Sequence, residues 1–157
     1  MKTSLQVSRK LLAAACATCF LLGTNPGHAA DEANLIQPKE LAAILTKPGG
    51  DKPILIHVGF PFLYRGRHIP NSVFAGPGSK PEGLEALKQA VAKLPRDREI
   101  VIYCGCCPWT ACPNMKPAIA LLRQLGYMKA RALMIPTNLA KDWTELGYPV
   151  EKGTSTP

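Results

Sequence analysis

The sequence lacks the marks of several common protein classes. Its longest apolar run, residues 11–22, is about half the ~20 residues that a membrane-spanning helix needs. Aromatic residues are scarce, at 6% of the chain, and lysine and arginine form no run. Neither a glycine-rich phosphate-binding loop nor the nucleophile elbow of serine hydrolases is found. These absences argue against a permanent membrane anchor, nucleic-acid binding and Ser/His/Asp hydrolysis.

Cysteine is also missing from most of the chain. Four of the six cysteines lie within residues 104–112, and the other two are Cys16 and Cys19. Those two fall in an N-terminal segment that starts with positive residues, continues through an apolar stretch and ends in small residues such as Ala29. This tripartite pattern is typical of a secretory signal peptide and predicts that residues 1–29 are removed. We therefore expect an exported protein, periplasmic if the source is Gram-negative.

The remainder, residues 30–157, has the length of one domain. Three positive charges of the formal net charge of +8 belong to the leader, which leaves +5 on the mature chain. Because these charges form no cluster, they indicate a solvated surface that favours small anions as partners.

Strand-like and helix-like segments alternate along the mature chain. Runs rich in β-branched residues predict strands, and apolar stripes of helical period predict helices. We expect helices over residues 37–46, 82–94, 114–125 and 139–146, strands over 54–58, 100–103 and 130–134, and a turn with a short strand over 68–74. This order predicts an α/β fold with a parallel central sheet flanked by helices on both faces. Ligands of such folds bind outside the carboxyl ends of the strands.

The cysteine-rich stretch begins where the strongest predicted strand ends. Cys104 follows residues 100–103 directly, and Cys106, Cys107 and Cys112 precede the next predicted helix. Backbone N–H groups of such a loop and the positive end of the following helix favour thiolate over thiol. The stretch is therefore the candidate site for sulfur, redox or metal chemistry.

Several segments together resemble the single-domain rhodaneses, which are sulfurtransferases. The resemblance covers about residues 35–152 and is strongest at 36–41, 54–59, 67–72, 100–104, 121–127 and 143–150. It implies a rhodanese-like fold in which Cys104 is the nucleophile. That cysteine would take a sulfane sulfur from a donor such as thiosulfate, hold it as a persulfide beside the loop amides, and pass it to cyanide or a thiol.

The chain departs from the family pattern around the same site. The loop after Cys104 is longer than usual, has no basic residue before Lys116 and contains three further cysteines. His57 and Gly59 stand where the family usually has aspartate and arginine. We expect Gly105, Trp109, Lys116 and Arg67 to contact the substrate, a small sulfur-containing anion.

Three interpretations of the cysteines stay open. In the first, Cys104 carries the persulfide without a cofactor, and Cys106, Cys107 or Cys112 resolves it as a disulfide with help from a thiol-redox partner protein. In the second, all four cysteines bind a soft ion such as Cu(I) or Zn(II). In the third, they form two structural disulfides in an oxidising compartment.

Overall fold

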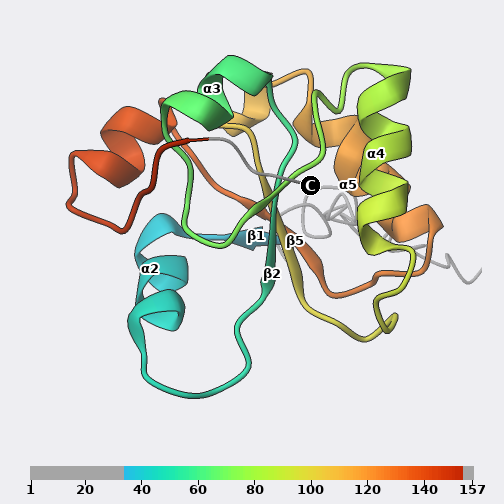
Figure 1. Cartoon of the computed structure of the whole chain (residues 1–157), viewed down its shortest axis with the longest axis horizontal. Helices are drawn as coiled ribbons and strands as arrows, with labels where there is room; N and C mark the ends of the chain where they lie inside the picture. Colours follow the sequence, from blue (N-terminus) through green and yellow to red (C-terminus); the bar gives the residue numbers. More distant parts are fainter. Residues whose placement is uncertain (1–33, 154–157) are drawn as a thin grey trace, which may run out of the picture.

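The computed structural model describes residues 34–153, so the predicted signal peptide lies outside the described residues. Its centre is a parallel sheet with the strand order β1-β5-β4-β2-β3 (Figure 1). The strands are β1 (Leu35–Ile36), β2 (Ile54–His57), β3 (Val73–Phe74), β4 (Ile100–Tyr103) and β5 (Ala130–Leu133). All four residues of β4 are buried, as expected for a central strand that is covered on both faces.

Helices cover both faces of the sheet. On one face α4 (Pro81–Val91) and α5 (Met115–Gln124) pack against each other and against the strands, through residues such as Leu87, Leu122 and Ile102. On the other face lie α2 (Pro38–Thr46) and the short π-helical segment η2 (Ala140–Thr144), whose Trp143 joins a second core with Leu41 and Val101. Figure 1 shows these two layers on opposite sides of the strands. The predicted α/β architecture is confirmed.

The main differences from prediction are short elements. The helix α3 (Pro61–Gly66), the two-residue strand β1 and the 3₁₀ turn η1 (Trp109–Ala111) were not expected. Six or fewer residues are too few for a periodic pattern to develop, so only tertiary contacts define such elements. The predicted last helix, residues 139–146, is shorter in the structure, where only the π-helical η2 forms (Ala140–Thr144).

The C-terminal segment is tied to the middle of the chain. His68 and Glu151 exchange backbone hydrogen bonds, and the His68 ring bonds the Tyr64 carbonyl at 2.8 Å and the Glu151 carboxylate at 3.0 Å. The sequence predicts a structural hydrogen bond for His68, which follows α3 in a turn beside Pro70, and a core position for Trp143. Both predictions are confirmed. No helix within residues 34–153 is long and apolar enough to cross a bilayer.

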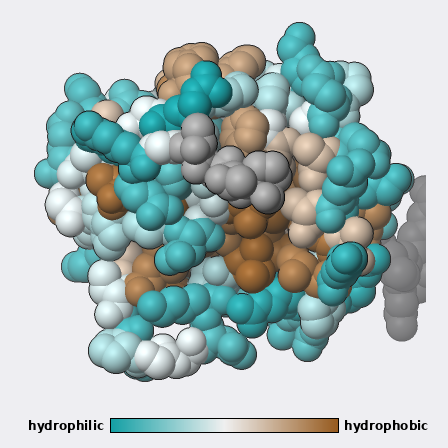
Figure 2. Space-filling model, in the orientation of Figure 1, coloured by the Kyte–Doolittle hydropathy of each residue, from teal (hydrophilic) through white to brown (hydrophobic). Residues whose placement is uncertain are grey.

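The surface is mostly hydrophilic, with several hydrophobic areas on the face drawn in Figure 2. One lies near the middle of the view, and a second lies over α3. Phe62 of α3 is 65% exposed, and its ring stacks on that of Phe60. This second area borders the cysteine loop, as described next.

Candidate functional site

Cys104 occupies the carboxyl end of the central strand. Its neighbour Tyr103 accepts a hydrogen bond from the Val58 N–H, which extends the pairing of β2 and β4 to the edge of the loop. The Cys104 side chain is buried, at 3% exposure. The sulfur thus stands where ligands bind in parallel α/β sheets.

The loop after Cys104 is fixed by the segment between β5 and η2. Gly105 has a φ of 86°, and a Cβ there would lie 2.8 Å from the Leu139 Cβ, so only glycine fits without strain. Its carbonyl accepts a hydrogen bond from the Leu139 N–H at 3.1 Å, and the Trp109 N–H donates to Ile135 at 2.9 Å. The loop is therefore anchored at both ends.

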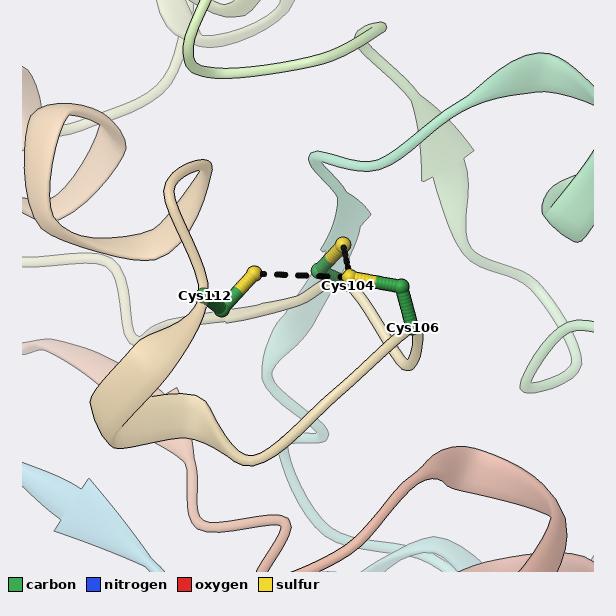
Figure 3. A group of neighbouring side chains, drawn as sticks. All are labelled: Cys104, Cys106 and Cys112. Carbon is green, nitrogen blue, oxygen red and sulfur yellow. Dashed lines mark hydrogen bonds between the residues drawn. The ribbon is translucent and has the colours of Figure 1, made fainter.

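Three of the cysteine sulfurs gather in what we call the three-sulfur cluster: Cys104, Cys106 and Cys112. Cys106 Sγ lies between the others, 3.3 Å from Cys104 Sγ and 3.8 Å from Cys112 Sγ (Figure 3). Cys107 Sγ lies 2.9 Å from Cys106 Sγ and does not belong to this group of three. All four thiols are free, so the two-disulfide interpretation finds no support among the described residues.

Asn114 holds the Cys104 sulfur from the helix side and was not among the expected site residues. Its side chain is fully buried, and its amide Nδ2–H donates to Cys104 Sγ at 3.3 Å. The Ser79 N–H donates to the amide oxygen at 3.1 Å, which fixes the orientation of the amide. The sequence shows only that Asn114 precedes α5. Its hydrogen bond with Cys104 could not be predicted, because it depends on how the loop between them folds.

The acidity of the cluster differs from the sequence-based expectation. The hydrogen bond with Cys104, aided by the Asn114 backbone N–H, lowers the pKa of Cys112 to about 5. The same bond with Cys112, together with burial, raises the pKa of Cys104 well above its usual range. These opposite shifts favour the thiolate form of Cys112, which lies next to the start of α5, over that of Cys104.

His57 and Gly59 form the floor beneath Cys104. A Cβ at Gly59 would lie 2.7 Å from Cys104 Sγ, so a larger residue here would displace the sulfur. The Gly59 N–H donates to His57 Nδ1 at 3.2 Å, which leaves the proton of the neutral ring on Nε2. Burial lowers the pKa of His57 to about 4. His57 is thus a neutral core residue beneath the site.

The cluster opens into a cavity of about 670 Å³, the Cys104 hollow. Gly105 and Arg67, two of the four residues predicted to contact the substrate, line it together with Phe62 and Thr144. The structure places the other two expected substrate contacts elsewhere. Trp109 and Lys116 line a separate hollow of about 330 Å³ with Arg123 of α5, and the structure does not bring them to the Cys104 hollow.

The family model of the rhodanese-like domain matches residues 37–134, more than half of the chain. The chain therefore belongs to the rhodanese-like domain family, a sulfurtransferase-type family. A comparison with curated proteins finds no match.

Solved structures share the fold. The BH2092 protein of Bacillus halodurans is 22% identical with a TM-score of 0.59, over 81% of this chain and 83% of that one. The single-domain sulfurtransferase RDL2 of Saccharomyces cerevisiae is 20% identical with a TM-score of 0.53, over 73% and 90% of the two chains. A thiosulfate sulfurtransferase of Pseudomonas aeruginosa is 26% identical with a TM-score of 0.56, over 78% of this chain but 20% of that chain.

Proposed function

We propose that this protein transfers sulfane sulfur through a persulfide on Cys104. The observation that carries the proposal is the position of Cys104 at the end of β4, facing the Cys104 hollow and bonded by the Asn114 amide. A donor group aimed at sulfur stabilises the negative charge that a persulfide carries. Arg67 in the same hollow supplies a positive charge for an anionic donor such as thiosulfate.

In the first step the Cys104 thiol gives its proton to the Cys112 thiolate and attacks the outer sulfur of the donor. With thiosulfate, a Cys104–sulfur bond forms, the sulfur–sulfur bond of thiosulfate breaks, and sulfite leaves with the electron pair. Cys106 Sγ supports this proton transfer as a relay, because it lies 3.3 Å from Cys104 Sγ and 3.8 Å from Cys112 Sγ, within the reach of sulfur hydrogen bonds. The product is the Cys104 persulfide anion beside the Asn114 amide.

In the second step an acceptor removes the sulfur. Cyanide or an external thiolate attacks the outer sulfur, and Cys104 leaves as its thiolate. Alternatively the thiol of Cys106, the exposed member of the cluster, gives its proton to the outer sulfur of the persulfide anion and attacks the inner sulfur, which expels hydrosulfide and leaves a Cys104–Cys106 disulfide. That disulfide needs two electrons from a dithiol partner to return to the starting state.

The proposal places this chemistry in an exported protein. In an oxidising compartment, four neighbouring thiols stay reduced only if a partner supplies electrons. A thiol-redox protein that docks at the exposed Cys106 fits this need, and the stacked Phe60 and Phe62 rings at the rim offer it an apolar contact.

Mass spectrometry of the reduced mature protein tests the function. After thiosulfate, the peptide that contains Cys104 should gain the mass of one sulfur, and cyanide should remove it. Cys104→Ser should abolish the gain, whereas Cys107→Ser, which alters a neighbouring thiol outside the cluster, should keep it. Sulfur uptake by the Cys104→Ser protein, or on a peptide from another cysteine in the wild type, would refute the assignment of Cys104.

A further inference from the structure

The geometry points to a binding site for one Cu(I) ion, held by the thiolates of Cys104, Cys106 and Cys112. The three sulfurs all lie within 4.8 Å of one another, and two of their separations are 3.3 and 3.8 Å. A thiolate–metal bond of about 2.3 Å places three sulfurs around an ion at separations of about 4.0 Å. To reach this triangle the Cys104–Cys106 separation would open by about 0.7 Å and the Cys106–Cys112 separation by about 0.2 Å.

The number of ligands favours a monovalent soft ion over zinc. Structural zinc sites are closed by four ligands, whereas the described residues bring only three sulfurs together. Cys107 is a poor fourth ligand, because its sulfur lies 2.9 Å from that of Cys106 and outside the group that surrounds the centre. Soft thiolates select Cu(I), and three of them suit a planar three-coordinate ion.

The three ligands come from positions that the fold fixes independently. Cys104 ends β4, Cys106 follows the glycine that bonds Leu139, and Cys112 lies just before α5, where the Met115 N–H donates to its carbonyl. Cys104 and Cys112 are each 3% exposed, while Cys106 is exposed to solvent. An ion can thus enter at Cys106 and bind against two buried sulfurs, as each bound thiol releases its proton to solvent.

The site would also regulate the proposed function, and this part of the inference rests on that function. Cys104 Sγ cannot act as a nucleophile while it is a copper ligand. Copper binding and sulfur loading then exclude one another, and the protein would transfer sulfur only when copper is scarce.

The test uses the reduced mature protein without oxygen and titrates it with Cu(I) against a coloured Cu(I) chelator. We expect one ion per chain and X-ray absorption showing three sulfur neighbours. Cys106→Ser, a change at an exposed position that the fold tolerates, should weaken binding by roughly 100-fold or more, above the loss typical of outer-shell changes. The matched variant Cys107→Ser should bind within about threefold of the wild type, because Cys107 is no ligand.

Alkylation of the wild type gives a second readout that does not depend on activity. One equivalent of Cu(I) should protect Cys106 from iodoacetamide while its neighbour Cys107 stays reactive. The inference is overturned if Cys106→Ser binds copper as tightly as the wild type, if Cys107→Ser loses as much affinity, or if both thiols are protected alike. Thiosulfate is omitted here because it binds Cu(I) itself. If copper binds as expected but the copper-free protein takes no sulfur from thiosulfate, the proposed function fails and the metal site stands.

Discussion

At the scale of single residues, the reactivity of Cys104 depends on groups that surround its sulfur on three sides. Gly59 leaves room beneath the sulfur, Asn114 donates to it, and Cys106 Sγ lies 3.3 Å away. The family's usual arginine at position 59 would not fit here, because even a Cβ would contact the sulfur. The glycine that stands in place of the family's arginine therefore leaves the space that the Cys104 sulfur needs.

Asn114→Asp should slow the formation of the persulfide. The variant keeps the shape of the side chain but replaces the donor to Cys104 Sγ with an acceptor of negative charge. A hydrogen bond to a charged group contributes ~1.5–3 kcal/mol, so we expect a rate about 10- to 100-fold lower. The measurement is the rate of sulfur uptake from thiosulfate by rapid-quench mass spectrometry.

Asn138→Asp is the control for this change. Asn138 lines the same hollow, and its side-chain oxygen accepts from the Lys141 N–H, a bond that aspartate can also accept. The control adds the same charge without contacting the sulfur, so its rate should stay within about threefold of the wild type. Equal slowing in both variants would assign the effect to charge in the hollow rather than to the Asn114 bond.

At the scale of elements, the site depends on how three connections meet. The loop after β4 rests on the segment after β5, and α5 begins where this loop ends. The segment after β5 is held by a reciprocal cap. Asp142 accepts hydrogen bonds from the N–H groups of Thr137 at 2.5 Å and Asn138 at 3.0 Å, while Asn138 accepts from Lys141. This cap positions Leu139, the residue that bonds Gly105.

Asp142→Ala should lower the free energy of unfolding by about 1 kcal/mol, the usual loss for a helix cap. Asp142→Asn keeps an oxygen acceptor for the two N–H groups and should recover more than half of that loss. Urea unfolding curves of the three proteins provide the comparison. A loss that is the same for alanine and asparagine would show that the charge, rather than the hydrogen bonds, stabilises the segment.

At the scale of the whole molecule, two cores on opposite faces of one sheet support a site at its carboxyl edge. His57 is fully buried at this edge, with its ring against those of Tyr64 and Tyr103. His68 and Glu151 close the same region by joining the C-terminal segment to the residues after α3. The stability of the fold is therefore coupled to the protonation of a buried ring.

Stability should fall as the pH is lowered from about 7.5 to about 5. Burial lowers the pKa of His57 from 6.5 to about 4 on folding, so within this window the unfolded chain binds a proton that the folded protein does not. Linkage then predicts a loss of about 2 kcal/mol from this residue by about pH 5. The measurement is urea unfolding across this range, alongside an NMR titration of the His57 ring.

His57→Gln provides the comparison, because His68 and the carboxylates are common to both proteins. The variant should show a pH dependence that is smaller by about the same 2 kcal/mol. A His57 ring that titrates near its ordinary pKa in the folded protein would contradict the prediction.

The sequence by itself determined the order of the main strands and helices, the placement of Cys104 at a strand end, and the structural roles of His68 and Trp143. These features depend on local patterns: β-branched runs, helical periodicity and the short segments that resemble the family. The boundaries of β4 and α5 agree with prediction within a residue, because both elements are regular and strongly patterned.

Only the tertiary structure decided how the cysteine loop is arranged. It lowered the pKa of Cys112 and raised that of Cys104, brought Asn114 to Cys104, and separated Trp109 and Lys116 from the Cys104 hollow. The loop has no repeating pattern, and its path depends on contacts with Leu139 and Ile135, which are distant in the sequence. Such contacts leave no local signal, because each depends on the position of another segment once the sheet has formed.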